Sequence, residues 1–441
     1  MPRASSGRVP QSSQERAVVV KVILRDDRSL EDPFAEVNAL AWTAGVEVVG
    51  MIPQRMERPN GTTYIGKGKL EEAARAVEEL DADAVIVDYD LSPAQERNLE
   101  KILKKKVVDR TQLILDIFAR RARTRQARLQ VELAQLKYNL PRLKRLWGHL
   151  SRYEGGIGMR GPGETQLEED KRLIRRRIQR LEEEIESIQL RNETLHRSRE
   201  RDFVVAIVGY TNAGKSTLLN RLTGSSEVVE DKLFATLEGR TRRWKIGPNR
   251  TVLVSDTVGF IRNLPHHLVA SFRATLEETR FADLLFHVVD ASSPDAERQI
   301  ATVDKVLRDL ECQDKPIWAI LNKWDAVGDG RIIEARHLRS RFGSGVSAFE
   351  VSAAAGTGIR ELVQAIDGHL DRASVRVEAV VPQSRGDLVA WLCANGKVVL
   401  QEHGDEGVRI AADLSPGRAA KFRLLWPAKA PDGSFPPQIP D

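Results

Sequence analysis

The sequence GYTNAGKS at residues 209–216 most constrains this chain of 441 residues, because it fits the pattern G-x-x-x-x-G-K-[ST]. A buried-type strand pattern at residues 203–208 precedes it, and a helical run at residues 216–222 follows. In this context glycines let backbone N–H groups turn inward around phosphates, and the helix N-terminus adds partial positive charge. An ordinary strand–loop–helix turn is the alternative, but the preceding strand favours a phosphate-binding loop.

The sequence NKWD at residues 322–325 selects the base, because it directly follows a strand-like run at residues 317–321. The Asp325 carboxylate can accept hydrogen bonds from guanine N1–H and its 2-amino group, whereas adenine N1 would oppose it with an acceptor. Asn322 can bridge to the phosphate loop, and Lys323 can lie over the ring. The pattern therefore predicts guanine specificity.

A third motif, DTVG at residues 256–259, follows the strand-like run at residues 251–255. We expect Ser216 to bind Mg²⁺ directly, Asp256 to hold it through water, and the Gly259 N–H to meet the γ-phosphate. A switch threonine completes the metal shell when the γ-phosphate is present. Thr236 is preferred over Thr241 for that role, and a solvent-facing loop threonine is the alternative.

Together these motifs predict a GTP site with Lys215, Thr236 and Gly259 in catalysis and with Ser216, Thr236 and Asp256 at the metal. The predicted nucleotide contacts are Gly209, Tyr210, Thr211, Asn212, Ala213, Gly214, Lys215, Ser216, Thr217, Phe234, Ala235, Thr236, Leu237, Asp256, Thr257, Val258, Gly259, Asn322, Lys323, Trp324, Asp325, Ser352, Ala353 and Ala354.

Phe260 stands where many switch GTPases carry a glutamine that orients the attacking water. Phenylalanine has no group for that role, so we expect slow hydrolysis by the free protein. Asn212 suggests a compensating K⁺ site beside the phosphates; an asparagine that braces the loop is the equal alternative.

The chain reads as a multidomain α/β protein, since 441 residues exceed the usual size of one domain. We expect a disordered lead at 1–16, an α/β domain with a parallel sheet at 17–109, and a helical hairpin with a glycine-rich loop at 110–200. A P-loop G domain follows at 201–371, then a small ferredoxin-like α+β domain at 372–427 and a flexible tail at 428–441. Alternating strand and helix patterns predict the parallel sheets, and heptad-like apolar spacing predicts the hairpin, with its second helix at residues 165–199.

The hairpin region is basic between residues 109 and 160, with Trp147, His149 and Tyr153 interleaved. Basic residues around aromatic ones suit phosphate backbones and splayed RNA bases. A solvated helix face is the alternative, although acidic partners at i,i+4 are missing there. The predicted RNA contacts are Arg120, Arg121, Arg123, Arg125, Arg128, Gly155, Gly156, Gly158, Arg160, Gly161 and Gly163.

A weaker signal, Gly66-Lys67-Gly68-Lys69, resembles a phosphate-contacting turn, but a plain turn is favoured. No run approaches the length needed to span a bilayer, and the polar N-terminus is not a secretory signal. Two isolated cysteines, Cys312 and Cys393, favour neither a disulfide nor a metal site, and a cytosolic location follows by default.

The runs at residues 108–119, 129–136 and 155–167, with LFATL at 233–237 and DTVGF at 256–260, resemble the HflX family of translational GTPases. The resemblance covers about residues 17–372. The sequence departs from the family pattern at Glu238-Gly239-Arg240, where an Asp and small or hydroxylated residues are expected.

The resemblance implies GTP hydrolysis stimulated by the large ribosomal subunit, splitting of stalled or idle ribosomes under stress, and a hairpin loop near the peptidyl transferase centre. It also implies ATP binding by the N-terminal domain in some members. We also expect a monomer. Two other functions stay open: an RNA-remodelling ATPase or GTPase with a second nucleotide site in the first domain, and a clamp that stores ribosomes.

Overall fold

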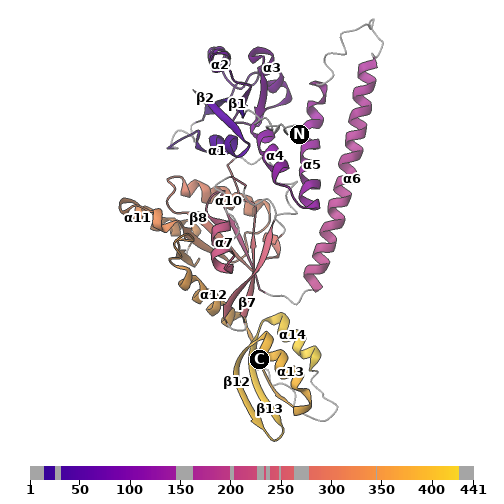
Figure 1. The fold of residues 1–441 in the computed structure, drawn as a ribbon, viewed down its shortest axis with the longest axis vertical. Helices are drawn as coiled ribbons and strands as arrows, with labels where there is room; N and C mark the ends of the chain where they lie inside the picture. Colours follow the sequence, from indigo (N-terminus) through magenta and orange to yellow (C-terminus); the bar gives the residue numbers. More distant parts are fainter. Residues whose placement is uncertain are drawn as a thin grey trace, which may run out of the picture. The chain divides into compact units, whose positions relative to one another are not determined.

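The computed structural model describes residues 14–24, 31–145, 162–198, 203–225, 233–234, 239–247, 250–262, 278–343 and 345–426. The chain forms two compact units. Met1–Ala122 and Val131–Arg180 belong to the first, and Arg123–Gln130 and most of the chain from Leu181 onward belong to the second. Figure 1 shows the elements coloured along the chain, and each unit is described by itself.

The first unit contains the predicted parallel sheet, with strand order β2-β1-β3-β4 and every neighbouring pair parallel. Its strands are β1 (Glu15–Ile23), β2 (Val46–Arg55), β3 (Ala84–Val87) and β4 (Lys106–Asp109), and its first helices are α1 (Ala35–Thr43), α2 (Lys67–Glu79) and α3 (Pro93–Leu103). Ser92 caps α3 and Gln95 closes a capping box, as the Ser92-Pro93 pair predicts.

Helix α4 (Arg110–Arg121) differs from the sequence expectation, which assigned these residues to the hairpin. The Asp109 side chain accepts a hydrogen bond from the Gln112 N–H and caps the helix. Leu113, Ile117 and Phe118 are buried, and the first compact unit continues to Ala122. The apolar face of α4 thus completes the N-terminal core, beyond the predicted boundary at residue 109.

The hairpin consists of α5 (Arg125–Asn139), a 3₁₀ turn (η2, Leu140–Arg145) and α6 (Pro162–Ser198). Two ion pairs join the helices: Arg125 with Glu184, and Arg177 with Glu132 at 2.8 Å. From Arg125 to Glu132 the position on α5 rises by seven residues, whereas the paired position on α6 falls by seven, from Glu184 to Arg177. The helices are therefore antiparallel, as predicted. Helix α6 begins before the predicted residue 165, because a proline is favoured in a first turn.

The second unit contains a six-stranded sheet of order β10-β9-β8-β5-β7-β6, in which only the β6–β7 pair is antiparallel. Its strands are β5 (Val204–Gly209), β6 (Arg240–Gly247), β7 (Arg250–Asp256), β8 (Leu284–Asp290), β9 (Ile317–Asn322) and β10 (Ala348–Glu350). Its described helices are α7 (Lys215–Thr223), α10 (Ala296–Asp309), α11 (Ile332–His337) and α12 (Ile359–Ala373), with 3₁₀ turns η3 (Trp324–Ala326), η4 (Asp329–Arg331) and η5 (Leu338–Phe342).

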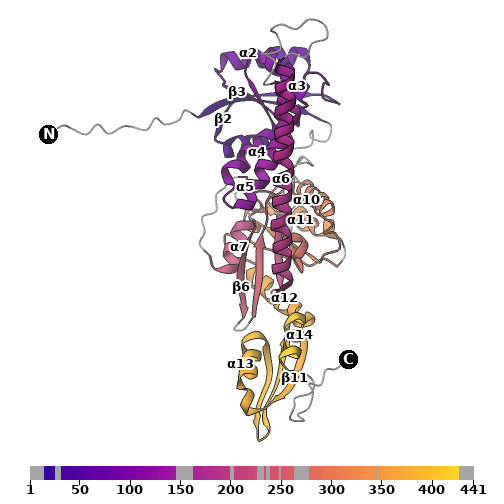
Figure 2. The ribbon, with the colours of Figure 1, turned by 90° about the vertical axis from the view of Figure 1, so that its right-hand side faces the viewer.

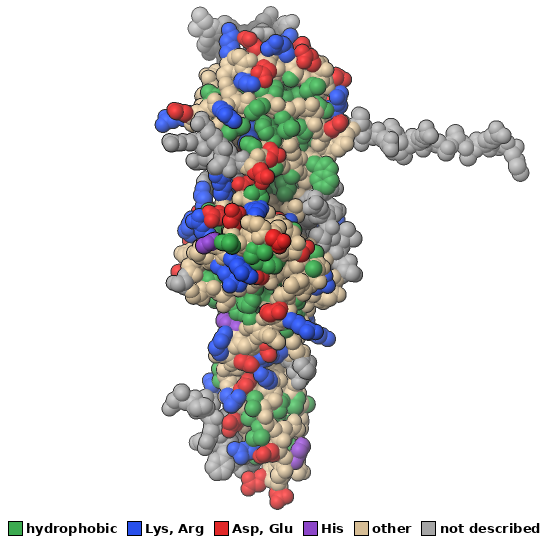
Figure 3. All heavy atoms as spheres, turned by 90° about the vertical axis from the view of Figure 1, so that its left-hand side faces the viewer, with side chains coloured by type: hydrophobic (Ala, Val, Ile, Leu, Met, Phe, Trp, Pro, Cys, Tyr) green, Lys and Arg blue, Asp and Glu red, His purple; other side chains and the backbone are tan. Residues whose placement is uncertain are grey.

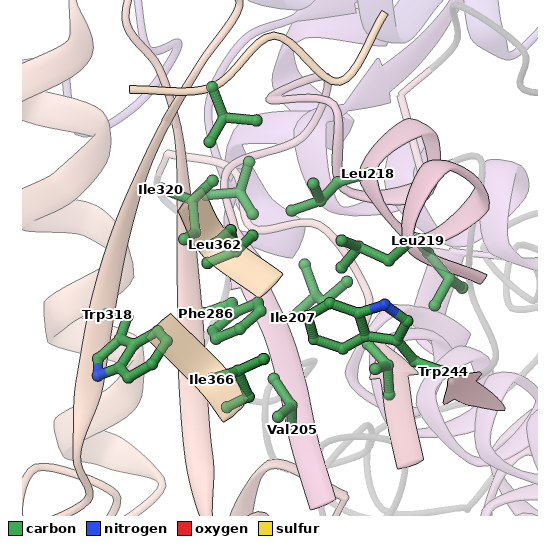
Figure 4. Packing of buried hydrophobic residues seen from close by; sticks show 14 of the residues in the cluster. Val205, Ile207, Leu218, Leu219, Trp244, Phe286, Trp318, Ile320, Leu362 and Ile366 are labelled. Carbon is green, nitrogen blue, oxygen red and sulfur yellow. The ribbon is translucent and has the colours of Figure 1, made fainter. Parts of the chain in front are cut away.

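Aromatic side chains fill the core on one face of this sheet (Figure 4). Phe286 stacks on Trp318 with ring centroids 5.7 Å apart and meets Trp244 edge-on at 6.4 Å. Leu218 and Leu219 of α7 and Leu362 and Ile366 of α12 cover the same cluster. This packing fixes the strand ends from which the nucleotide motifs project.

The C-terminal residues form β11 (Val375–Val381), η6 (Gln383–Arg385), α13 (Gly386–Asn395), β12 (Lys397–Gly404), β13 (Gly407–Leu414) and α14 (Pro416–Leu425). The sheet has order β11-β13-β12, and both pairings are antiparallel. Leu392 of α13 and Phe422 of α14 share its core. Three strands of the predicted ferredoxin-like β-α-β-β-α-β pattern lie within the described residues, and the chain beyond Trp426 lies outside them.

Cys312 and Cys393 are both free thiols. A search of the described residues finds no helix with the length and apolar character needed to cross a membrane.

Candidate nucleotide site

The phosphate loop lies between β5 and α7, as the motif predicts. Gly214 has φ +90°, and a Cβ there would lie 2.2 Å from Nδ2 of Asn322. Both the backbone conformation and the available space therefore require glycine at this position. Asn212 also has positive φ, 60°, a conformation that asparagine tolerates better than most residues.

Lys215 is the buried cation of this loop, with 7% of its surface exposed. Its Nζ donates to the Tyr210 carbonyl at 2.8 Å. Burial lowers the pKa of Lys215 to about 8, although the Asp256 carboxylate acts in the opposite direction. A desolvated ammonium at the first turn of a helix is suited to bind phosphate oxygens.

The structure brings together Ser216 and Asp256, two residues predicted at the metal. The Ser216 hydroxyl donates to Asp256 Oδ2 at 2.8 Å, and Asp256 is 1% exposed. A hydroxyl and a carboxylate are oxygen ligands of the kind that Mg²⁺ prefers, usually with several waters or phosphate oxygens around it. The donor set therefore fits the predicted ion.

The third motif lies against the phosphate loop. A Cβ at Gly259 would lie 2.9 Å from Thr211 Cα, so only glycine allows this approach. The Thr257 hydroxyl donates to the Ile207 carbonyl at 2.8 Å, and Val258 is buried. The Gly259 backbone consequently lies beside the loop that is predicted to hold the phosphates.

Phe260 is buried, with 1% exposed, in an apolar cluster that includes Ala206, Val208 and Leu285. Its backbone pairs with the phosphate loop: the Phe260 N–H donates to Gly209 O at 3.2 Å, and the Thr211 N–H donates to Phe260 O at 2.8 Å. This side chain packs in the core of the domain and offers no polar group to an attacking water.

Asn322 joins the two ends of the site. Its Nδ2 donates to the Ala213 carbonyl at 2.8 Å, and its Oδ1 accepts the Ala353 N–H at 3.0 Å. The first contact is the bridge that the sequence predicts, and the second adds the loop that follows β10. The Ser352 hydroxyl accepts the Ala355 N–H at 3.0 Å, and Arg221 donates to the carbonyls of Ala353 and Ala354, which stabilises that loop.

Asp325 is exposed at the start of η3, next to the partly buried Trp324. Lys323, predicted to lie over the base, has φ 58° and its Nζ lies 2.7 Å from Asp290 Oδ2. Asp290, at the end of β8, was not selected from the sequence. The Lys323–Asp290 ion pair fixes the start of the turn that carries Asp325.

Three of the predicted nucleotide contacts, Ala235, Thr236 and Leu237, lie outside the described residues, whereas Phe234 is described and buried. Thr241, the less favoured switch threonine, is in β6, and its hydroxyl lies 3.2 Å from that of Ser255. The structure thus places Thr241 in the sheet, and the role of Thr236 stays a prediction.

Glu278 is a site residue that the sequence reasoning missed. Its carboxyl accepts hydrogen bonds from the hydroxyls of Ser255 and Thr241. A Cβ at Gly239 would lie 2.5 Å from Glu278 Oε2. Burial raises the pKa of Glu278 to about 7, with a further contribution from the Asp256 charge. No local pattern marks this residue, because its partners lie on β6 and β7.

His287 of β8 was also missed. It is 1% exposed, and its ring meets Phe342 edge-on with centroids 5.0 Å apart. Burial, with a smaller contribution from the Lys215 charge, lowers the pKa of His287 to about 3. The imidazole is therefore neutral near pH 7 and adds no charge beneath the phosphate loop.

Some basic residues of this run pair with acidic residues from distant segments of the chain. Arg110 pairs with Asp88 at 2.6 Å and with Glu36. Arg142 pairs with Glu96 at 3.0 Å and with Asp109 at 3.2 Å. The i,i+4 test considered only local pairing and could not find these contacts.

The predicted RNA contacts have varied surroundings. Arg120, Arg123, Arg125 and Arg128 are exposed, and Arg121 is half-buried. Arg120 donates to the Ala44 carbonyl at 2.5 Å, and Arg125 pairs with Glu184. Gly163 lies in the first turn of α6, whereas Gly155, Gly156, Gly158, Arg160 and Gly161 lie outside the described residues.

The Gly66–Lys69 segment is a turn into α2. The Gly66 N–H donates to Gln54 Oε1 at 2.9 Å, and Lys69 pairs with Glu72 at 2.8 Å. These contacts agree with the favoured interpretation of a plain turn.

A phosphate loop, a paired serine and aspartate, and a guanine-type loop tied to them by Asn322 define the class of the domain built on the six-stranded sheet: it is a P-loop GTPase domain. Three family models match the chain: "GTP-binding GTPase N-terminal" at residues 31–119, "GTP-binding GTPase Middle Region" at 121–199, and "50S ribosome-binding GTPase" at 204–323.

Curated relatives give the particular family. The chain is 45% identical over 405 residues to GTPase HflX of Caldanaerobacter subterraneus subsp. tengcongensis, covering 91% of each chain. It is 42% identical over 400 residues to GTPase HflX of Escherichia coli K12, covering 88% of this chain and 93% of that one. The chain belongs to the GTPase HflX family, and it binds and hydrolyses GTP.

Among solved structures, the chain resembles a GTP-binding protein from the archaeon Sulfolobus solfataricus in complex with GDP. The two are 27% identical, with a TM-score of 0.44, and the match covers 80% of this chain and 98% of that one.

Proposed function

We propose that this GTPase binds the large ribosomal subunit in its GTP form, is stimulated there to hydrolyse GTP, and thereby separates stalled or idle ribosomes under stress. The observation that carries the proposal is the match of residues 204–323 to a family described as 50S ribosome-binding GTPases. The buried Phe260 supports it, since a site without a water-orienting side chain depends on a partner for fast turnover. We propose that the protein acts in the cytoplasm.

At the nucleotide, Lys215 binds the β- and γ-phosphates, the Gly259 N–H contacts the γ-phosphate, and Asp325 reads guanine. Ser216 and Asp256 hold Mg²⁺, Asp256 through water, and Thr236 joins them in the GTP state. When bound, the ion neutralises charge that develops on the phosphates. The Ser216–Asp256 contact of 2.8 Å supports this set.

Asn212 is proposed to help bind K⁺ beside the phosphates. Its side chain is exposed, and within the described part of the chain it makes no hydrogen bond that would brace the loop. Turnover in K⁺ buffer should exceed turnover in Na⁺ buffer, and Asn212→Ala should remove the difference. Equal wild-type rates in the two buffers would exclude the K⁺ site.

Sedimentation with large subunits in the presence of a GTP analogue, GDP or ATP tests the partner. We expect co-sedimentation with the GTP analogue, weaker binding with GDP, and no effect of ATP. Lys215→Ala should abolish GTP binding. If the wild-type protein sediments with the subunit in none of these nucleotide states, the proposal is rejected.

Light scattering of intact ribosomes separates splitting from storage. Loss of the intact particle with GTP supports splitting, whereas a stable particle with bound protein supports a storage clamp. Deleting residues 155–163 should spare GTP binding and remove the ribosome response, because that glycine-rich segment, with Arg120, Arg121, Arg123, Arg125 and Arg128, is proposed to contact ribosomal RNA. Normal splitting by the deleted protein would end this assignment.

A further inference from the structure

Helix α6 carries arginines that neither the nucleotide site nor the predicted RNA contacts use. Arg172, Arg175, Arg176 and Arg180 are all exposed. The side chain of each makes no ion pair or hydrogen bond with another residue in the described part of the chain. Their neighbour Arg177 differs, because it pairs with Glu132 of α5 at 2.8 Å.

The four arginines share one face of the helix. At about 100° per residue, Arg172, Arg176 and Arg180 form a row at i, i+4 and i+8, and Arg175 lies beside it. The apolar positions Ile174, Ile178 and Leu181 project to the opposite side, and Leu181 is fully buried. We call the four residues the arginine face of α6; Figure 2 shows α6 as one continuous helix.

The arginine face is not a salt-bridged helix surface of the ordinary kind. Arg172 and Arg180 occupy the i−4 and i+4 positions of Arg176, so its helical neighbours are like charges, which destabilise a helix. Arg175 has Lys171 and Gln179 at the same positions, and Lys171 is itself paired with Glu168 at 2.6 Å. By contrast, charges of both signs are interspersed over the face of the molecule in Figure 3.

We propose that the arginine face of α6 binds the phosphate backbone of structured RNA. Four guanidinium groups without acidic partners complement a polyanion, and each can donate two parallel hydrogen bonds to one phosphate. The row from Arg172 to Arg180 spans about 12 Å at 1.5 Å per residue, long enough to follow several phosphates of one strand. The identification of that RNA as ribosomal rests on the proposed function.

The test uses the full-length protein with Arg172, Arg176 and Arg180 changed to Gln. A matched control changes Arg75, Arg97 and Lys101, exposed cations of α2 and α3 in the same unit, to Gln. A third variant carries Lys at positions 172, 176 and 180. Circular dichroism and GTP affinity verify that each variant is folded.

Binding is measured by fluorescence anisotropy with a base-paired RNA hairpin across a salt series, and by sedimentation with purified large subunits. The Gln variant should bind the hairpin at least about tenfold more weakly, and the slope of log affinity against log salt should fall by about two to three. The control variant should retain the wild-type slope. The Lys variant should retain the slope with lower affinity, because it keeps the charge and loses the bidentate geometry.

Each result has a distinct meaning. A Gln variant that binds both probes like the wild type overturns the inference, and so does an equal loss in the control variant. Loss of subunit binding with unchanged hairpin binding assigns the face to a protein partner and also overturns it. If wild-type protein binds the hairpin but no subunit, the proposed function fails and the arginine face stands.

Discussion

Asn322 is the residue at which the two ends of the nucleotide site meet. One amide side chain contacts the phosphate loop through Ala213 and the base-side loop through Ala353. At 2% exposed it cannot exchange these partners for water. A buried amide with both groups satisfied holds the phosphate-binding and base-binding segments in one arrangement.

Asp325→Asn should change the preferred base. The amide opposes the guanine 2-amino group with a donor, so GTP affinity should fall by about 100-fold or more. Xanthine carries an oxygen at that position, so XTP affinity should rise. Competition against a fluorescent nucleotide measures both, and an unchanged ratio of GTP to XTP affinity would contradict the role of Asp325.

Glu278→Gln should change how stability depends on pH. A carboxyl with a pKa near 7 keeps a proton that the unfolded chain releases near pH 4.5, so the wild-type free energy of unfolding falls as pH rises between these values. The fall is at most about 3 kcal/mol. The variant lacks this titrating group, so its free energy of unfolding should equal that of the wild type at pH 5 and exceed it at pH 8.

Urea unfolding of the nucleotide-free protein measures this difference, and comparison of two proteins cancels the other titrating groups. Glu334→Gln is the control, because that side chain is 74% exposed. A Glu278→Gln protein less stable than the wild type at pH 8 would contradict the prediction, because it would show that the ionised carboxylate stabilises the fold.

Some residues of the site can be recognised from a short sequence motif, and others only from their contacts in the folded protein. Lys215, Ser216, Asp256 and Asn322 follow strands and belong to short motifs, so the sequence places them correctly at one edge of the sheet. Glu278 and Asp290 gain their positions only from contacts across the fold. Nothing near them in the sequence distinguishes them from other surface acids.

Helices and strands likewise differ in whether a local sequence pattern predicts them. The β–α alternation predicts the parallel N-terminal sheet and the parallel part of the six-stranded sheet, and the apolar spacing predicts the antiparallel hairpin. The sequence does not predict strand β6, because the basic residues Arg240, Arg242, Arg243 and Lys245 stand close to Trp244 along the chain. The burial of Trp244 comes from its packing against α7 and Phe286. The sequence assigns helix α4 to the hairpin because its packing against α1 is not a local property.

The turn η2 is anchored to the N-terminal sheet by Arg142, whose guanidinium also donates to the Leu91 carbonyl at 2.6 Å. Arg142→Ala should lower the stability of this unit by about 3–5 kcal/mol, because Glu96 and Asp109 would keep buried charge without their partner. Hydrogen exchange of the β4 amides measures the loss.

Lys69→Ala is the matched control for that prediction, because it lies in the same unit. Its pair with Glu72 is partly exposed to solvent, since 46% of the Glu72 side chain is accessible, so the change should be below about 1 kcal/mol. Equal effects of the two substitutions would show that Arg142 contributes no more than a surface charge.

At the scale of the whole molecule, the chain consists of two compact units, and the GTP site lies in the second. A ligand that binds only the folded form stabilises the unit that holds it, by about 2.7 kcal/mol at 100 times its Kd. Calorimetry with GTP analogue should therefore raise the midpoint of one unfolding transition and leave the other unchanged.

Lys215→Ala should remove that shift while keeping both transitions. If the nucleotide moves both midpoints together, the units unfold cooperatively and the division does not hold in solution.

The burial of Phe260 has a consequence for how such a protein evolves. A glutamine at this position would place its amide among Ala206, Val208 and Leu285 and away from the phosphates, because the backbone on both sides is bonded to the phosphate loop. A single exchange at this position therefore does not supply a group that orients the attacking water. If hydrolysis by the free protein is slow, as proposed, selection would change the rate of the cycle through surfaces that contact a partner.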